Sequence, residues 1–208
     1  MSEELGRIEK PSAADLRKGR KLYFIPLVYA GSEPPEEYRE KLDKYWEQVE
    51  GQVRDLELKL AKIRRVYHEL IAVGGEEGIA AMKEVNEKSH HLAAARVEAG
   101  AQLEATEDAE VLTEFVDWSR CLAIGLQNER VFTTVYESCV AAGKKRNEYI
   151  ARHLDETLQD DETGAFFMRE GHQVQFPPDI QIFYVAPPAL DEINRWLRDR
   201  RAKSQGGQ

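Results

Sequence analysis

"KLYFIPLVYAG", from Lys21 to Gly31, is the stretch that decides the fold of this 208-residue chain. Aromatic and branched residues dominate the run, and Gly31 ends it. Because consecutive residues are apolar, the run predicts a strand that is covered on both faces, as in the centre of a parallel sheet. Such a strand needs neighbours to pair with.

Candidate neighbours lie in the last quarter of the chain. The segments "AFFMR" (165–169) and "IQIFYVA" (180–186) are short and apolar, and a loop with two prolines separates them. After Pro187, "ALDEINRWLRDRR" predicts a last helix, with acids early and arginines late as the helix dipole favours. We therefore predict an α/β fold with a small, mostly parallel sheet, in which Leu22–Val28 and Ala165–Met168 are neighbours.

The middle of the chain, about 34–158, is predicted to form a large helical region. Apolar residues from Tyr38 to Leu70 recur at steps of three or four, which indicates a helix that can reach Ala72. Gly143 is expected to separate two later helices. The helices after the first are predicted at 76–100, 106–142 (capped by Thr106, with Gly125 as a candidate break) and 144–158. We expect one domain at 21–202, with mobile tails at 1–20 and 203–208.

Composition restricts the classes of partner. The net charge of −9 disfavours a nucleic-acid binder, because a field of this sign repels phosphates. No apolar run approaches the length needed to span a bilayer, and the first twenty residues lack a secretory signal, so we expect a cytoplasmic protein without a membrane partner. Cys121 and Cys139 lack metal-site spacing and are expected to be buried, reduced thiols.

Common catalytic and cofactor motifs are missing from the sequence. There is no GxSxG, Walker loop, GxGxxG or HExxH. Glu87 and His90 form an ExxH pair of the kind used in di-iron bundles, but the chain has no second copy. A surface Glu–His pair is the favoured interpretation, and we expect neither a metal nor a cofactor.

A candidate site follows the strand at 165–168. Ligands of parallel sheets bind at the carboxyl ends of the strands, and His172 and Glu170 come just after this one. Arg146 and Asn147 begin the preceding helix, and because the strand retraces that helix, one of them should lie beside the turn. The alternative is a solvated loop histidine.

The order of several segments resembles a family of uncharacterised prokaryotic proteins. The chain has "KLYFIPLVYAG", "VYHELIAVGG", "EAGAQLEATEDAEVL" and "RNEYIARHLDETLQDDETGAFFMREGHQVQFPPDIQIF" in the family's order. The last segment is the most specific and is also similar, more distantly, to the closing part of the TraB/ChaN/erythromycin-esterase-like group. That resemblance implies a site at Arg146, Asn147 and His172, and a strand near 63–67 where periodicity indicates helix.

The resemblance also implies an activity, which this chain fits only in part. A hydrolase of the TraB/ChaN kind would use His172 as base or metal ligand, Glu69 or Glu170 as acid or second ligand, and Arg146 as an anion clamp. The family usually has histidine where this chain has Tyr29, and glycine where it has Arg169. These departures indicate a degenerate site without a metal.

Three functional hypotheses follow. The leading one is a protein that binds a small ligand or a protein partner in a shallow polar pocket formed by Arg146, Asn147, His172 and Tyr29. The second is a TraB/ChaN-like hydrolase, with or without a metal, against which the departures at Tyr29 and Arg169 count. The third is a structural or assembly protein that uses its helical surface. Homo-oligomerisation stays open.

Overall fold

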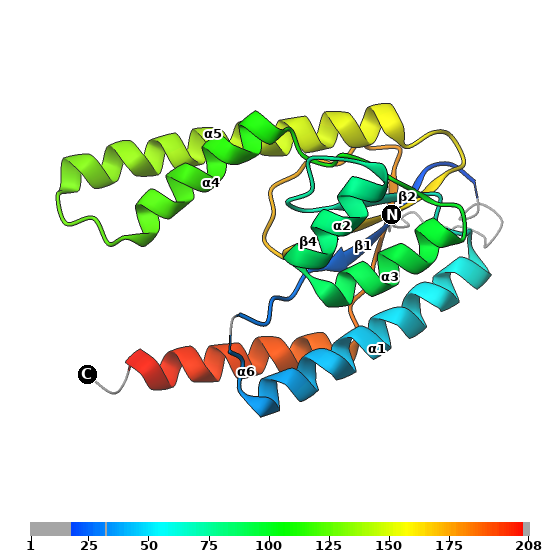
Figure 1. The fold of residues 1–208 in the computed structure, drawn as a ribbon, viewed down its shortest axis with the longest axis horizontal. Coiled ribbons are helices and arrows are strands. Elements are labelled where there is room, and N and C mark those ends of the chain that lie inside the picture. The colour runs from blue at the N-terminus through cyan, green and yellow to red at the C-terminus, as the bar shows by residue number, and fades with distance from the viewer. Residues whose placement is uncertain (1–17, 32, 206–208) are drawn as a thin grey trace, which may run out of the picture.

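A computed structural model describes residues 18–31 and 33–205, so most of the predicted tails at 1–20 and 203–208 lies outside it, while residues 203–205 belong to the last helix. The described chain forms a five-stranded, all-parallel sheet with the order β3-β2-β4-β1-β5 (Figure 1). The predicted α/β class is confirmed. The strands are β1 (Lys21–Pro26), β2 (Arg65–His68), β3 (Gln102–Leu103), β4 (Thr163–Met168) and β5 (Gln181–Tyr184).

Six helices are present within the described ranges. They cover both faces of the sheet, and one pair extends past it. They are α1 (Glu36–Lys59), α2 (Gly75–Val85), α3 (Glu87–Glu98), α4 (Ala109–Ala123), α5 (Glu129–Thr157) and α6 (Pro188–Gln205).

Strands from near both ends of the chain pair in the centre of the sheet, as the apolar runs predict. β1 pairs with β4 on one side and with β5 on the other, so Phe24 lies between Phe166 and Tyr184. Every residue of β1 and β4 is buried. The expected neighbours Leu22–Val28 and Ala165–Met168 are thus confirmed in their strand portions, because only a central position covers both faces of such strands.

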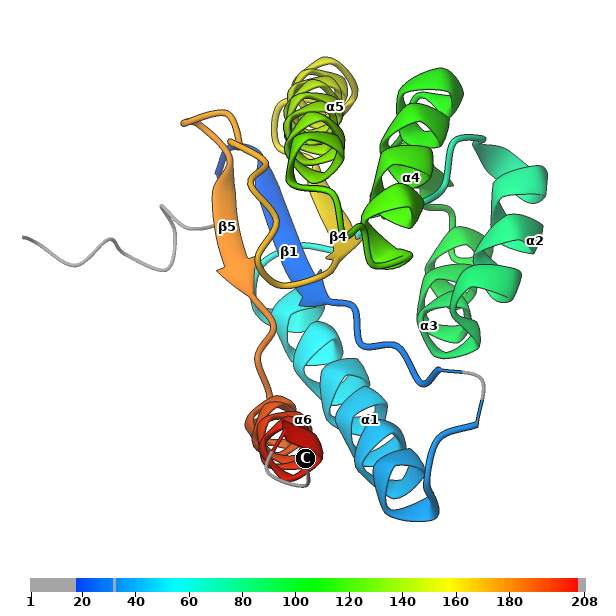
Figure 2. The ribbon, with the colours of Figure 1, turned by 90° about the vertical axis from the view of Figure 1, so that its left-hand side faces the viewer.

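Alternate residues of the strands pack against different layers. Tyr23 and Ile25 of β1 belong to a core shared with α1, α2, α3 and α6, while Leu22 and Phe24 belong to a second core shared with α5. Figure 2 shows α5 above the sheet and α1 and α6 below it. This alternation follows from the two-residue period of a strand, and it decides which side chains at the strand ends face α5.

The helices α4 and α5 form a hairpin that runs past the sheet, to the left in Figure 1. Only the second half of α5 contributes to the sheet core, through Ile150, Leu154 and Leu158 just beyond its end. No residue of α4 is buried. The hairpin therefore leaves apolar side chains exposed, among them Tyr136 and Val140.

Two helix boundaries differ from the sequence prediction. The stripe from Tyr38 does not continue to Ala72, because α1 ends at Lys59 and β2 follows, as the family resemblance implied. Gly143 does not separate two helices but lies inside α5, where a Cβ would stand 3.3 Å from the ring of Phe115. The missing side chain at this position lets α4 approach α5 closely.

Smaller differences concern caps and one strand. Asp108, not Thr106, caps α4, and its side chain accepts hydrogen bonds from the N–H groups of Glu110 and Val111. The predicted helix at 76–100 is divided at Asn86, whose side chain caps α3. The two-residue β3 was not predicted. None of the helices in the described ranges is both long and apolar enough to cross a membrane.

Gly164 and Gly51 provide a matched test of the packing. A Cβ at Gly164 in β4 would lie 2.9 Å from Leu22 Cδ1 and 3.0 Å from Tyr67 Cε2, whereas a Cβ at Gly51 in α1 would meet nothing within 4 Å. We expect Gly164→Ala to lower the free energy of unfolding by about 1–3 kcal/mol through overpacking. Gly51→Ala should raise it by about 0.5–1 kcal/mol, because alanine favours helix. Urea denaturation measures both, and equal signs would contradict this packing.

Candidate functional site

The candidate site lies where the strand connections diverge. The chain leaves β1 and β2 toward helices on one face, while the segment after β4 packs on the other face with α5. β4 lies between β1 and β2. The connections that leave neighbouring strands therefore go to opposite faces of the sheet, and open parallel sheets bind ligands in the crevice at such a point. A cavity of about 500 Å³ is found here, between the turn after β4 and the α4–α5 hairpin.

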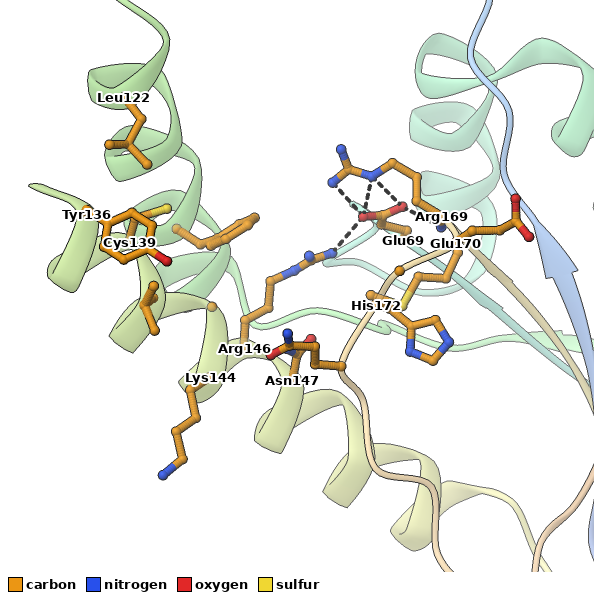
Figure 3. A pocket seen from close by; sticks show the side chains of 16 residues that line it. Glu69, Leu122, Tyr136, Cys139, Lys144, Arg146, Asn147, Arg169, Glu170 and His172 are labelled. Carbon is orange, nitrogen blue, oxygen red and sulfur yellow. Dashed lines mark hydrogen bonds and ion pairs between the residues drawn. The ribbon is translucent and has the colours of Figure 1, made fainter. Parts of the chain in front are cut away.

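Glu69, the first residue after β2, is the centre of the polar side of this cavity (Figure 3). Its side chain is 1% exposed. The carboxylate accepts hydrogen bonds from Arg169 Nη2 at 2.8 Å, from Arg169 Nε and from the Arg169 backbone N–H, both at 3.0 Å. It also accepts one from Arg146 Nη2 at 3.3 Å. Two guanidinium groups therefore converge on one buried acid.

Arg146 is held by a second buried acid, Glu107, which follows β3. Arg146 Nε donates to Glu107 Oε2 at 2.9 Å, and Arg146 Nη2 donates to Glu107 Oε1. The guanidinium carbon also lies 5.1 Å from the ring centroid of Phe115 on α4. Arg146 is thus fixed by one acid on each of two strand ends and by an aromatic ring on the hairpin.

Glu107 also holds the backbone turn after β2. Its carboxylate accepts a hydrogen bond from the Leu70 N–H at 3.0 Å, and its own N–H donates to the Ile71 carbonyl at 3.0 Å. Leu70 has a φ of 69°, a left-handed conformation that costs a side-chain-bearing residue free energy. These contacts support the turn that places Glu69 between the two arginines.

The ion pairs keep Glu69 ionised. Burial by itself would raise the pKa of Glu69, but hydrogen bonds from Arg169 and the positive charges of Arg169 and Arg146 outweigh that effect and lower the pKa below its ordinary value. A buried carboxylate in this state is not a free general base, because both of its oxygens already accept hydrogen bonds. Its role is to orient the arginines.

Each arginine keeps one nitrogen available. The Nη1 atoms of Arg146 and Arg169 donate to no partner in the part of the chain that the structure describes, although both residues line the cavity. Asn147 lines the same cavity and also makes no side-chain hydrogen bond with a described residue. Lys144 is 78% exposed at its mouth. The polar side therefore presents several hydrogen-bond donors and the carboxylate of Glu69, whose oxygens already accept hydrogen bonds.

The other side of the cavity is apolar. Figure 3 shows Leu122, Tyr136 and Cys139 on the hairpin, apart from the cluster of Glu69 and Arg169. The apolar lining residues are Phe115, Leu122, Tyr136, Val140 and Met168.

His172 lines the cavity edge, but it belongs to an aromatic cluster. Its ring lies 4.9 Å from the ring of Phe24 and 5.5 Å from that of Phe176. Burial lowers its pKa, partly offset by the charge of Glu69. Its Nδ1 accepts a hydrogen bond from the Val174 N–H at 3.3 Å, which leaves a neutral ring with the proton on Nε2.

Two predicted site residues are positioned differently from the expectation. Glu170 accepts hydrogen bonds from the Tyr184 hydroxyl and the Asn194 amide, so its carboxylate is turned away from the arginines. Tyr29 does not line this cavity, because the chain after β1 turns toward α1 on the opposite face. It lines a second cavity of about 690 Å³ beside α1 and the α2–α3 junction, and Arg169 lies 6.0 Å from its ring centroid.

Arg169 stands where the resembled family has glycine, but its position does not need glycine's conformational freedom. The left-handed residue of the turn is Gly171, with a φ of 80°, and Arg169 is not among the residues with positive φ. Glycine's conformational freedom is thus used two residues later, and the position of Arg169 tolerates a side chain. That side chain supplies most of the hydrogen bonds to Glu69.

His68 and Ser89 form a buried pair behind the site. His68 Nδ1 donates to the Glu69 carbonyl at 2.6 Å, and Ser89 lies 2.8 Å from His68 Nε2. Burial lowers the pKa of His68 to about 4, so the ring is neutral and Ser89 is its donor. Both residues are fully buried. The pair resembles a nucleophile and its base in connectivity only, because no ligand reaches the serine.

The structure brings together Arg146, Asn147 and His172 of the predicted site, with Glu69. Sequence reasoning missed Glu107 and the apolar wall, and it took Arg169 only as a departure from the family's glycine. Within the described ranges, no group of three or more His, Cys, Asp or Glu side chains is arranged to hold a metal ion. The chain matches no protein-family model, no curated protein and no solved structure, so the geometry of its own residues is what bears on its function.

Proposed function

We propose that this protein binds a small anionic ligand in the cavity between the turn after β4 and the α4–α5 hairpin. The observation that carries the proposal is the pair of guanidinium groups that Glu69 orients, both of which line the cavity and have an Nη1 atom without a hydrogen-bond partner in the described chain. Guanidinium groups donate in a fixed, planar arrangement that suits carboxylate and phosphate oxygens.

The rigidity of the arrangement supports binding as its function. Arg146 is 5% exposed and has two acids and an aromatic ring around it, so its donors are positioned before a ligand arrives. Pre-organised donors lose little conformational freedom on binding, which favours affinity. The cavity volume of about 500 Å³ also lies in the range of small-molecule sites.

The same contacts favour binding over acid–base catalysis. Glu69 and Glu170 both accept hydrogen bonds from neighbouring side chains. The ring of His172 is packed among aromatic residues. A general base needs a lone pair within reach of the substrate. The arginines occupy the oxygens of Glu69, the Val174 N–H occupies the accepting nitrogen of His172, and the carboxylate of Glu170 is turned away from the arginines.

Arg169→Gln tests the proposal directly. Arg146 still pairs with the buried Glu69 in this variant, so the substitution should destabilise the protein without unfolding it while it removes a charged donor from the cavity. We expect anion affinity to fall roughly ten- to hundredfold, the value of a charge-assisted hydrogen bond. Isothermal titration calorimetry with a panel of carboxylates and phosphates, beside their neutral analogues, measures this.

Arg120→Gln is the matched control. Arg120 is an exposed arginine on α4 that pairs only with the nearby Asp117 and does not line the cavity. Its loss should leave anion affinity unchanged. If both variants reduce binding equally, or if no anion binds the wild-type protein, the proposed function is wrong.

A further inference from the structure

We infer that the ligand is amphiphilic, with a single anionic group on Arg146 and Arg169 and an apolar chain that lies along the α4–α5 hairpin. This inference rests on the proposed function and names the class of ligand. A medium-chain fatty acid is the simplest molecule of that class. The argument joins the available arginine donors to a second observation, the exposed apolar surface of the hairpin.

The first half of α5 carries large apolar side chains that no part of the described chain covers. Tyr136 is 52% exposed and Val140 is 54% exposed, and both line the cavity. They stand at steps of four along the helix, so they share one face with Lys144. Neighbouring apolar side chains left in water commonly mark a binding surface.

The helix α4 supplies the opposite wall. Phe115 and Leu122 line the same cavity, and no residue of α4 is fully buried. From Arg146 back to Tyr136 the helix covers ten residues, about 15 Å at 1.5 Å per residue. The apolar path therefore starts at the guanidinium groups and has the length of an alkyl chain rather than of a small inorganic anion.

The charges of the site suit one negative charge. Glu69 and Glu107 balance the charges of Arg146 and Arg169, and Lys144 balances Glu170, so the lining has no excess of positive charge for a polyanion. A nucleotide with several phosphates would bring excess negative charge close to two buried carboxylates. A single carboxylate head brings one negative charge to the guanidinium groups and avoids that repulsion.

The continuity of the two surfaces favours a small molecule over a second copy of the chain. The exposed residues of α5 and the arginines line a single hollow. A helix packed from a second chain would cover the apolar face but would leave the Nη1 donors unpaired. One amphiphilic anion satisfies both.

The test is calorimetric titration of the full-length protein with acetate, hexanoate and decanoate, with decanol as the uncharged comparison. Affinity should rise about fourfold for each added methylene, the value of burying one CH₂ group. Decanol should bind much more weakly than decanoate, at one site per chain. Arg169→Gln should weaken every carboxylate by a similar factor.

Two valines on α5 provide a matched pair of variants. Val140 lines the cavity, whereas Val131 is 47% exposed and does not line it. Val140→Asn should remove the dependence of affinity on chain length and, because it adds no charge, leave the binding of acetate or phosphate intact. Val131→Asn should change neither.

The outcomes separate the two proposals. If short anions bind in an Arg169-dependent way but affinity does not increase with chain length, the ligand class is wrong and anion binding stands. If no anion binds at all, both are wrong. A concentration-dependent dimer in sedimentation, dissociated by Val140→Asn but not by Val131→Asn, would assign the apolar face to a second copy and overturn the inference.

Discussion

Replacing Arg146 by methionine should lower the free energy of unfolding by about 3–5 kcal/mol, the usual effect of removing one partner from a buried ion pair. The reason is the pair of carboxylates that remain. Glu69 and Glu107 are each 1% exposed, and Glu107 has no other charged partner in the described chain. Without Arg146, a buried negative charge is left uncompensated. Denaturation in urea, followed by circular dichroism, measures the change.

Two further variants make the result interpretable. Lys145→Met removes the neighbouring charge, which is 61% exposed and pairs with Glu114 on the surface, so its effect should stay within about 0.5 kcal/mol. Adding Glu107→Gln to Arg146→Met should recover part of the loss, because it removes the uncompensated charge. An Arg146→Met variant as stable as Lys145→Met would show that the carboxylates are hydrated and the network is not buried.

As the pH falls, protonation of His68 should destabilise the protein at a higher pH than protonation of the protein's carboxylates does. Burial lowers the pKa of His68 from 6.5 to about 4. Between these values the unfolded chain binds a proton that the folded chain does not bind, so stability is present above pH 6.5 and is lost as the pH falls. The loss reaches about 3 kcal/mol at pH 4, at about 1.36 kcal/mol per pH unit.

The measurement is the free energy of unfolding from pH 7 to pH 4 in wild type and in His68→Gln. The variant should lose most of this slope, whatever its stability at pH 7, and keep the smaller part that comes from His172, whose pKa burial also lowers. His91→Gln is the control, because His91 is 70% exposed and should leave the slope unchanged. A slope that persists in His68→Gln would mean that other groups titrate. Below this range, protonation of Glu69 should destabilise further, because its pKa is also lowered in the fold.

The fold could be predicted where the pattern of a segment matched only one structure. The continuous apolar run of β1 and the short apolar run of β4 fit the pattern of a buried strand better than that of a helix. β2 was ambiguous, because Ile63, Tyr67 and Leu70 continue the helical spacing of α1 although the chain has left the helix. β3 has only two residues, too few for any periodicity.

The candidate site could be predicted in part, for similar reasons. Arg146 and His172 line one cavity because β4 runs back along the helix that precedes it, so the carboxyl end of the strand returns to the level of Arg146. Glu107 depends on β3, so its place opposite Arg146 had no signal in the sequence. For the apolar wall, the signal in the sequence was misleading. The spacing of Tyr136 and Val140 is that of a buried helix face, and only the extension of α5 past the sheet leaves them exposed.

The central claim, that Arg146 and Arg169 hold an anion, is tested most directly by NMR of the protein labelled with ¹⁵N in its arginines. Titration with decanoate should shift the side-chain resonances of Arg146 and Arg169 together, saturating at one equivalent. The resonances of Arg120 should not move, and decanol should leave the two cavity arginines unperturbed. Saturable shifts confined to other arginines, or equal shifts with decanol, would contradict the claim.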